Sequence, residues 1–201
     1  MNKLVFFLVL VCLSVQLQAK TMVQLGAGLD LLGHQTFSNS SLGSNSGVNT
    51  GVSLYGELLS SGKFFSGNML FGIGMEYQLP RELKDLSPDL HRRQFSYLPL
   101  YVTLKYVVLP VGISPEVLLQ GGYNILVNQK NFDYSQTDGF SANGGFYWAI
   151  GGGVDFKPFV LQLLYKSSHS SFEWDDVSAS VQHLESNNVY SQLSLQLGIR
   201  L

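Results

Sequence analysis

Three side chains at alternate positions in the C-terminal part of the chain could together carry out nucleophilic chemistry. His169, Ser171 and Glu173 would share one face of an extended strand, because successive side chains of a strand point to opposite faces. A histidine oriented by a carboxylate and within hydrogen-bond reach of a serine hydroxyl can activate that hydroxyl. Short patterns of this kind match often by chance, and residues 167–171 are simply rich in serine. We therefore favour a non-enzymatic protein and keep a catalytic role for these residues only as an alternative.

Other catalytic and cofactor chemistries have little support in the sequence. The single cysteine, Cys12, lies in an apolar segment that we expect to be removed, so the mature chain would offer no thiolate for catalysis or metal binding. Gly26 and Gly28 begin like a dinucleotide fingerprint, but the third glycine is missing. The formal net charge of −2 argues against nucleic acid as a partner. We expect no cofactor and no metal.

Residues 1–19 have the pattern of a secretory signal peptide. Lys3 supplies the positive charge, residues 4–15 are apolar apart from Ser14, and Ala19 is a small residue at which a peptidase could cut. The apolar run is too short for a transmembrane helix. We predict that residues 1–19 are cleaved during export and that residues 20–201 form a single domain.

The rest of the chain is dominated by alternation of apolar and polar residues, which is typical of strands. The clearest case is the C-terminus, where every second residue from Leu193 to Leu201 is leucine or isoleucine. The same pattern predicts a strand at 23–31. Six further strands are predicted between these two, at 48–59, 64–78, 95–109, 116–129, 143–156 and 159–169. Each is about as long as the ~9–11 residues that a tilted strand needs to cross a bilayer.

The connections between these strands alternate between short and long. Turns rich in Ser, Gly, Lys and Pro are predicted at 60–63, 110–115 and 157–158. Long polar loops are predicted at 33–47, 79–94, 130–142 and 170–188. Transmembrane barrels have short periplasmic turns and long extracellular loops. The predicted fold is therefore all-β: an eight-stranded antiparallel transmembrane up-and-down β-barrel.

The distribution of charge decides which face of the strands is outside. Hydrophobic residues make up 45% of the chain and charged residues only 13%, whereas roughly a quarter to a third of a soluble surface is charged. The apolar face is therefore predicted to contact lipid and the polar face to line the interior. The charged residues assigned to that interior are Asp30, Glu57, Glu76, Lys105, Glu116, Asp155, Lys166 and Arg200.

This polar network of the lumen is predicted to be internally paired. Eight strands enclose a space only just wide enough for side chains, and charges in such a space need partners. Carboxylates outnumber bases, so we expect some of them to stay in contact with water near a mouth, Glu116 above all. We expect each base to be bridged to a carboxylate, with glutamines between them: Lys105, Lys166 and Arg200 as bases, and Gln24, Gln120 and Gln196 as glutamines.

The mature chain resembles the OmpA/OmpX-like outer membrane protein β-barrel superfamily along its whole length. The resemblance lies in residues 97–106, 120–123 and 151–159 and in the alternating last strand. It implies a monomer in the bacterial outer membrane, in contact with outer-membrane lipids and lipopolysaccharide. The family's last strand usually ends in Phe, which the barrel-assembly machinery reads. Here the assembly signal is predicted to be Leu197, Ile199 and Leu201.

Three functions follow from this sequence. We favour a non-enzymatic barrel that serves membrane integrity, adhesion or surface interaction through its four long extracellular loops, which could bind an extracellular ligand. The second is a narrow, porin-like pore, which paired charges in the lumen would argue against. The third is a membrane hydrolase like the lipid A deacylases, which share this barrel size and use an outward His and Ser with an acidic partner. His169, Ser171 and Glu173 would fill those roles, but the Asn and small residues that follow that family's Ser are missing.

Overall fold

The computed structural model describes residues 20–38, 45–64, 67–80, 96–108, 112–127, 139–175 and 183–201. The predicted signal peptide, residues 1–19, lies outside these ranges and stays a prediction, as do the central parts of the long loops. Within the described ranges, no helix has the length and apolar character needed to span a membrane.

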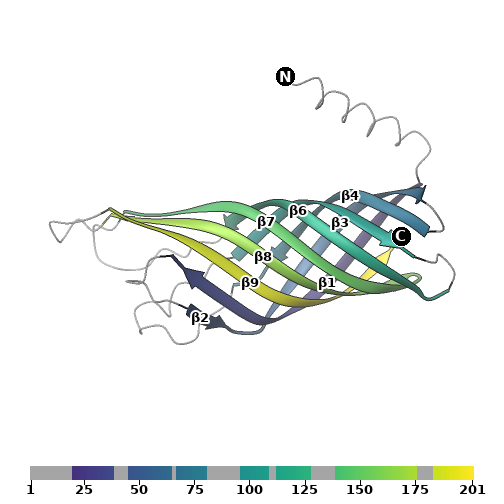
Figure 1. Ribbon diagram of the computed structural model, residues 1–201, viewed down its shortest axis with the longest axis horizontal. Coiled ribbons are helices and arrows are strands. Elements are labelled where there is room, and N and C mark those ends of the chain that lie inside the picture. The colour runs from purple at the N-terminus through teal and green to yellow at the C-terminus, as the bar shows by residue number, and fades with distance from the viewer. Residues whose placement is uncertain are drawn as a thin grey trace, which may run out of the picture.

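Nine antiparallel strands form one sheet, and eight of them close into a barrel (Figure 1). Each strand pairs with the next along the chain, except that β1 pairs with β3, and β9 pairs back to β1. The strand that is not part of the closed barrel, β2, is short and pairs with the end of β1. The prediction of an eight-stranded antiparallel barrel is thus confirmed. The strands are β1 (Lys20–Phe37), β2 (Asn45–Val48), β3 (Gly51–Phe64), β4 (Gly67–Gln78), β5 (Ser96–Val107), β6 (Ser114–Val127), β7 (Gly139–Phe156), β8 (Phe159–Asp175) and β9 (His183–Arg200).

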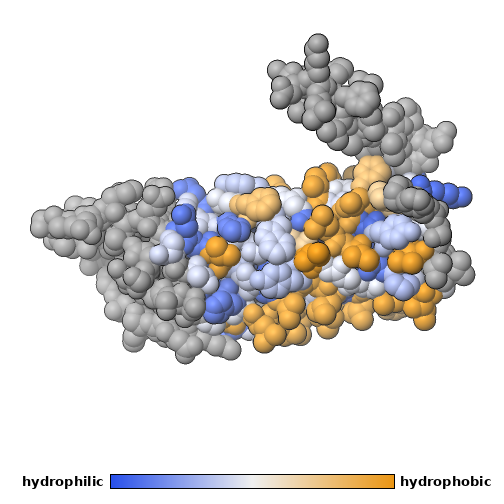
Figure 2. All heavy atoms as spheres, viewed as in Figure 1, coloured by the Kyte–Doolittle hydropathy of each residue, from blue (hydrophilic) through white to orange (hydrophobic). Residues whose placement is uncertain are grey.

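Alternation along each strand separates an apolar outside from a polar inside. On β9, Leu195 and Leu197 are 41% and 53% exposed, whereas the intervening Gln196 is 1% exposed. On the face seen in Figure 2, apolar side chains gather over the middle and turn-side half of the barrel, and we call this region the apolar band. Closure pairs the backbone groups of neighbouring strands, which a chain in lipid requires. Lipid can therefore replace water around the apolar band without leaving backbone groups unpaired.

Several strands run further toward the loops than the sequence predicted. β1 continues to Phe37, β7 begins at Gly139, and β8 and β9 pair as far as Asp175 and His183. The predicted loops at 33–47, 130–142 and 170–188 are therefore partly strand. The predicted turn at 60–63 is also wrong, because these residues belong to β3. Polar, serine-rich sequence predicts a loop, but pairing with the neighbouring strand continues through these residues.

The extra length lies on one side of the barrel and forms a protruding sheet. We define this sheet as residues 33–37 of β1, β2, residues 139–145 of β7, 168–175 of β8 and 183–190 of β9. β4 ends at Gln78 and β5 begins at Ser96, well short of it, and Figure 1 shows β7, β8 and β9 reaching beyond the other strands. At about 3.3 Å per residue, 168–175 alone extends about 23 Å.

A bulge at Leu32 marks where β1 enters the protruding sheet. Leu32 has a φ of 50° and is 77% exposed, and the register with β9 shifts between Leu31 and His34. A leucine in the left-handed region is uncommon and indicates a locally imposed bend. The extra residue switches the inward side chains from even to odd positions, because Asp30 and Gln35 are both buried.

Candidate functional site in the barrel lumen

All eight charged residues predicted for the interior lie inside the barrel, and their ion pairs form three successive layers. The layer nearest the turns is built around Arg200 of β9. Its guanidinium donates to Asp155 Oδ2 at 2.7 Å and to Glu116 Oε2 at 3.0 Å. The same group donates twice to Gln24 Oε1, at 2.8 and 3.0 Å. Arg200 thereby connects β9 to β1, β6 and β7 across the lumen.

The middle layer is built around Glu57 of β3. Its carboxylate is ion-paired with Lys105 of β5, and both side chains are essentially unexposed. Tyr101 Oη and Gln120 Nε2 also donate to Glu57, at 3.3 and 3.2 Å. Gln120 in turn accepts from Tyr147 Oη at 2.9 Å. The buried carboxylate therefore has one cationic and two neutral donors, as charge at this depth requires.

The third layer, nearer the loops, is built around Lys166 of β8. Its ammonium lies 2.6 and 2.8 Å from the two carboxylate oxygens of Glu76, and 3.5 Å from Asp30 Oδ1. Gln196 and Gln78 also donate to Glu76, at 3.1 and 3.2 Å. The three glutamines expected between the charges, Gln24, Gln120 and Gln196, thus each hold one of these layers together.

One expectation about the lumen is wrong. Glu116, which was predicted to stay wet beside the turn, is only 2% exposed. It accepts hydrogen bonds from Arg200 and from Gln162 of β8. Proximity to a turn in sequence did not leave it at a mouth, because apolar side chains close the barrel below it.

Apolar and aromatic side chains fill the lumen beyond and between the charged layers. On the turn side, Leu59, Leu70 and Val107 are buried together. On the loop side, the rings of Tyr97 and Tyr190 stack with centroids 5.3 Å apart and planes at 3°. Tyrosines were not predicted for the lumen. Their position on the same face as the charged residues of their strands was the signal that could have found them.

A filled lumen should not conduct. We expect purified wild-type protein in planar bilayers to give no large, steady channel, because the ion-paired layers and the two closures occupy the path. Single-channel recording at neutral pH measures this directly. A stable open conductance of the wild type would contradict the plug and favour the pore.

The alternative catalytic residues are only partly brought together. His169 and Ser171 lie on β8 within the protruding sheet, two positions apart. No hydrogen bond joins their described side chains, and the ring of His169 lies 6.2 Å from that of Phe146. The side chain of Glu173 lies outside the described part of the chain. The base-to-hydroxyl contact that the hydrolase alternative needs is therefore not formed here.

The predicted assembly signal lies on the outside of the last strand. Leu197, Ile199 and Leu201 are 53%, 42% and 72% exposed. Leu201 exchanges two backbone hydrogen bonds with Val23, which joins the end of the chain to β1. These side chains are accessible from the lipid side, and their recognition by assembly machinery stays a prediction.

A closed eight-stranded antiparallel barrel with an apolar exterior and a polar, ion-paired interior is the architecture of small, OmpA/OmpX-like outer-membrane β-barrels. The fold predicted from the sequence is thus confirmed. Solved structures of this type resemble the chain. Neisserial surface protein A has 14% identity and a TM-score of 0.48, with 90% of this chain and 97% of that one covered.

Two further solved structures are similar over most of their length. Ail of Yersinia pestis has 15% identity and a TM-score of 0.38, with 92% and 100% of the two chains covered. A major outer membrane protein of Thermus thermophilus has 11% identity and a TM-score of 0.39, with 90% and 99% covered. No family model matches the sequence, and no curated protein matches it.

Proposed function

We propose that this protein is a non-enzymatic outer-membrane barrel that makes surface contacts through the protruding sheet and the loops it carries. The observation that supports this proposal is the asymmetric extension of β7, β8, β9 and β1 beyond the apolar band. Integrity of the membrane needs only the barrel itself. A sheet built outward on one side is a rigid platform for a partner.

The outward side chains of β8 show where the platform leaves the apolar band. Leu163 and Tyr165 are 51% and 42% exposed, as expected for lipid contact. Beyond them, the outward positions change to polar residues: Ser167 is buried (3% exposed), and His169 and Ser171 are partly exposed. Polar residues in regular strands hold their donors and acceptors in fixed positions, which favours specific contacts over simple solvation.

The protruding sheet also has edges that can take part in recognition. Within the described residues, β2 pairs only with β1, and residues 139–143 of β7 pair only with β8. Exposed edge strands offer backbone donors and acceptors to an extended segment of a partner. The closed lumen supports surface interaction over the pore.

A truncation of the sheet tests the proposal. Ser171 of β8 is paired directly with Asn187 of β9, so residues 172–186 can be replaced by Asn-Gly, the turn preferred in two-residue hairpins. The barrel and its ion pairs should remain. We expect cells producing the truncated protein to adhere to epithelial monolayers, or to one another, no better than cells lacking it, whereas wild-type protein promotes adherence.

Two controls separate loss of function from loss of the barrel. Heat-modifiable migration on gels shows whether the truncated protein is folded. An epitope tag within 81–95 should be reachable on intact cells, and a tag at 65–66 should be reachable only after permeabilisation. The interaction role would be rejected if cells with wild-type protein, with truncated protein and with no protein adhered equally. Labelling of the 65–66 tag on intact cells would reject the orientation in which the loops face outside and the turns face the periplasm.

A further inference from the structure

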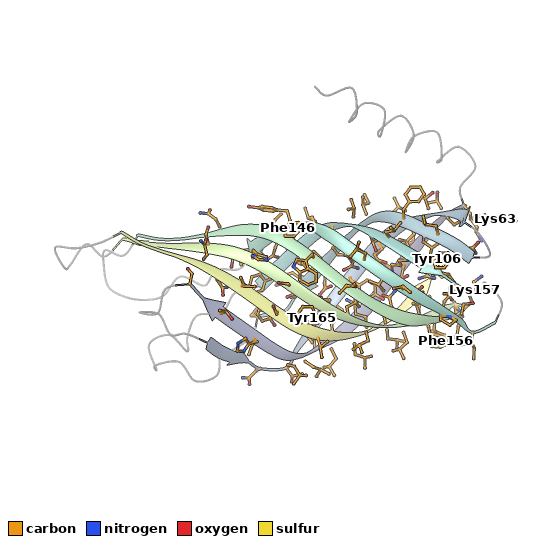
Figure 3. The ribbon with its side chains drawn as sticks, viewed as in Figure 1. Lys63, Tyr106, Phe146, Phe156, Lys157 and Tyr165 are labelled. Atoms are coloured by element: carbon orange, nitrogen blue, oxygen red, sulfur yellow. The ribbon has the colours of Figure 1, made fainter. Side chains whose placement is uncertain are left out.

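Among the residues whose side chains the structure describes, the basic groups outside the lumen all lie at the turn end of the barrel. Of the basic residues whose side chains the structure describes, Lys105, Lys166 and Arg200 are inside the barrel. The other three are exposed and lie at the turn end, where β1 begins, β3 ends and β7 joins β8. Figure 3 shows two of them, Lys63 and Lys157, at this end. We call Lys20, Lys63 and Lys157 the turn-side rim.

Strand pairing brings two of these lysines close together. Lys20 is paired with Ser61, whose hydroxyl donates to the Lys20 carbonyl at 3.3 Å, and Lys63 follows two residues later. Lys157 lies in the two-residue turn between β7 and β8. The rim therefore presents one pair of ammonium groups and a third from another hairpin.

No described acidic side chain offsets this charge. Glu116 and Asp155 lie nearest to the turn end, but they are 2% and 3% exposed and both are bound by Arg200 inside the barrel. The other described carboxylates, Asp30, Glu57 and Glu76, are also buried in the lumen. The described residues thus carry three exposed positive charges at one rim, with Lys20 and Lys63 at inward positions where β1 and β3 reach the mouth and Lys157 in a turn.

The rim borders directly on the apolar band. Phe156 and Phe159 flank Lys157, are 38% and 42% exposed, and have ring centroids 5.9 Å apart. A lysine at such a boundary, as Lys157 is, can lay its stem along apolar surface and place its ammonium group at the level of the lipid headgroups. Phosphate groups of lipids are the charged groups found at that depth.

We propose that the turn-side rim binds the headgroups of anionic phospholipids in the leaflet at that side of the membrane. Lys20 and Lys63 hold one headgroup phosphate between them, and Lys157 with its two phenylalanines holds a second lipid at the opposite hairpin. The barrel thereby gains a preference for anionic over zwitterionic lipid at the turn side.

Lipid selectivity measured by electron spin resonance tests this inference. Mature protein, residues 20–201, is reconstituted in phosphatidylcholine vesicles with spin-labelled phosphatidylglycerol or spin-labelled phosphatidylcholine, and the motionally restricted fraction gives the relative affinity. Since each lysine near an anionic surface contributes about 1 kcal/mol, wild type should favour phosphatidylglycerol on the order of five-fold. The preference should shrink in high salt.

Substitutions at the rim decide whether these residues are responsible. The triple variant Lys20→Gln, Lys63→Gln, Lys157→Gln should bind the two labelled lipids almost equally. The triple Lys→Arg variant should keep the wild-type preference. Heat-modifiable migration confirms that all proteins are folded. Absence of a preference in wild type, or an unchanged preference in the Gln variant, would overturn the inference.

Discussion

Replacing Lys105 with methionine is expected to destabilise the barrel by about 3–5 kcal/mol, because it leaves a buried carboxylate without its cationic partner. Lys105 and Glu57 are ion-paired and essentially inaccessible, so water cannot replace the lost ammonium. Methionine fills a similar volume, which keeps any cavity small. Unfolding by urea in phosphatidylcholine vesicles, followed by tryptophan fluorescence, measures the change in free energy.

Two variants identify the cause of this loss. The double variant Lys105→Met, Glu57→Gln removes both charges and should recover most of the stability. Lys63→Met changes an exposed lysine and should alter stability by no more than about 0.5 kcal/mol in zwitterionic lipid. If Lys105→Met were as stable as wild type, the ion pairs would not be what holds the lumen together.

Replacing Leu197, on the outward face of β9, with arginine should destabilise the barrel by a comparable amount. Leu197 is 53% exposed and lies in the middle of the outward apolar positions of β9. An arginine facing lipid near the bilayer midplane costs about 2–4 kcal/mol. We expect slower folding into vesicles and a lower unfolding midpoint in urea.

The depth dependence of this effect provides a matched control. Thr21 is exposed on β1 close to the turn end, so Thr21→Arg should cost less than about 1 kcal/mol. Unperturbed, heat-modifiable folding of Leu197→Arg would refute the assignment of the outward face of β9 to lipid.

The sequence predicted which face of each strand points inward, because within the membrane-spanning part of a barrel charged side chains are accommodated only in the lumen. Lys105, Lys166 and Arg200 alternate with apolar residues, and lipid excludes them from the outside. Partners could not be predicted in the same way. Lys105 meets Glu57, which lies two strands away, and Arg200 meets Glu116 across the lumen. Such contacts depend on strand tilt and register, which alternation does not encode.

The ends of the strands beyond the apolar band could also not be predicted from the sequence. Outside the apolar band, serines on both faces of residues 167–171 give no alternation to detect, although ladder pairing continues there. The bulge at Leu32 was hidden for a related reason. Leucine is an ordinary strand residue, and only the paired neighbours reveal that its φ is 50°. Pairing between strands, rather than local propensity, determined both features.

The position of Arg200 in the last strand links neutralisation of the interior to closure of the barrel. Glu116 and Asp155 come from β6 and β7, which are made earlier, and Arg200 is the base that bonds to both. Gln24 of the first strand binds the same guanidinium. Without β9 between β8 and β1, these two carboxylates would lack their base. Closure between β9 and β1 and neutralisation of these carboxylates therefore depend on the same strand, so we expect a barrel that lacks β9 to be unstable.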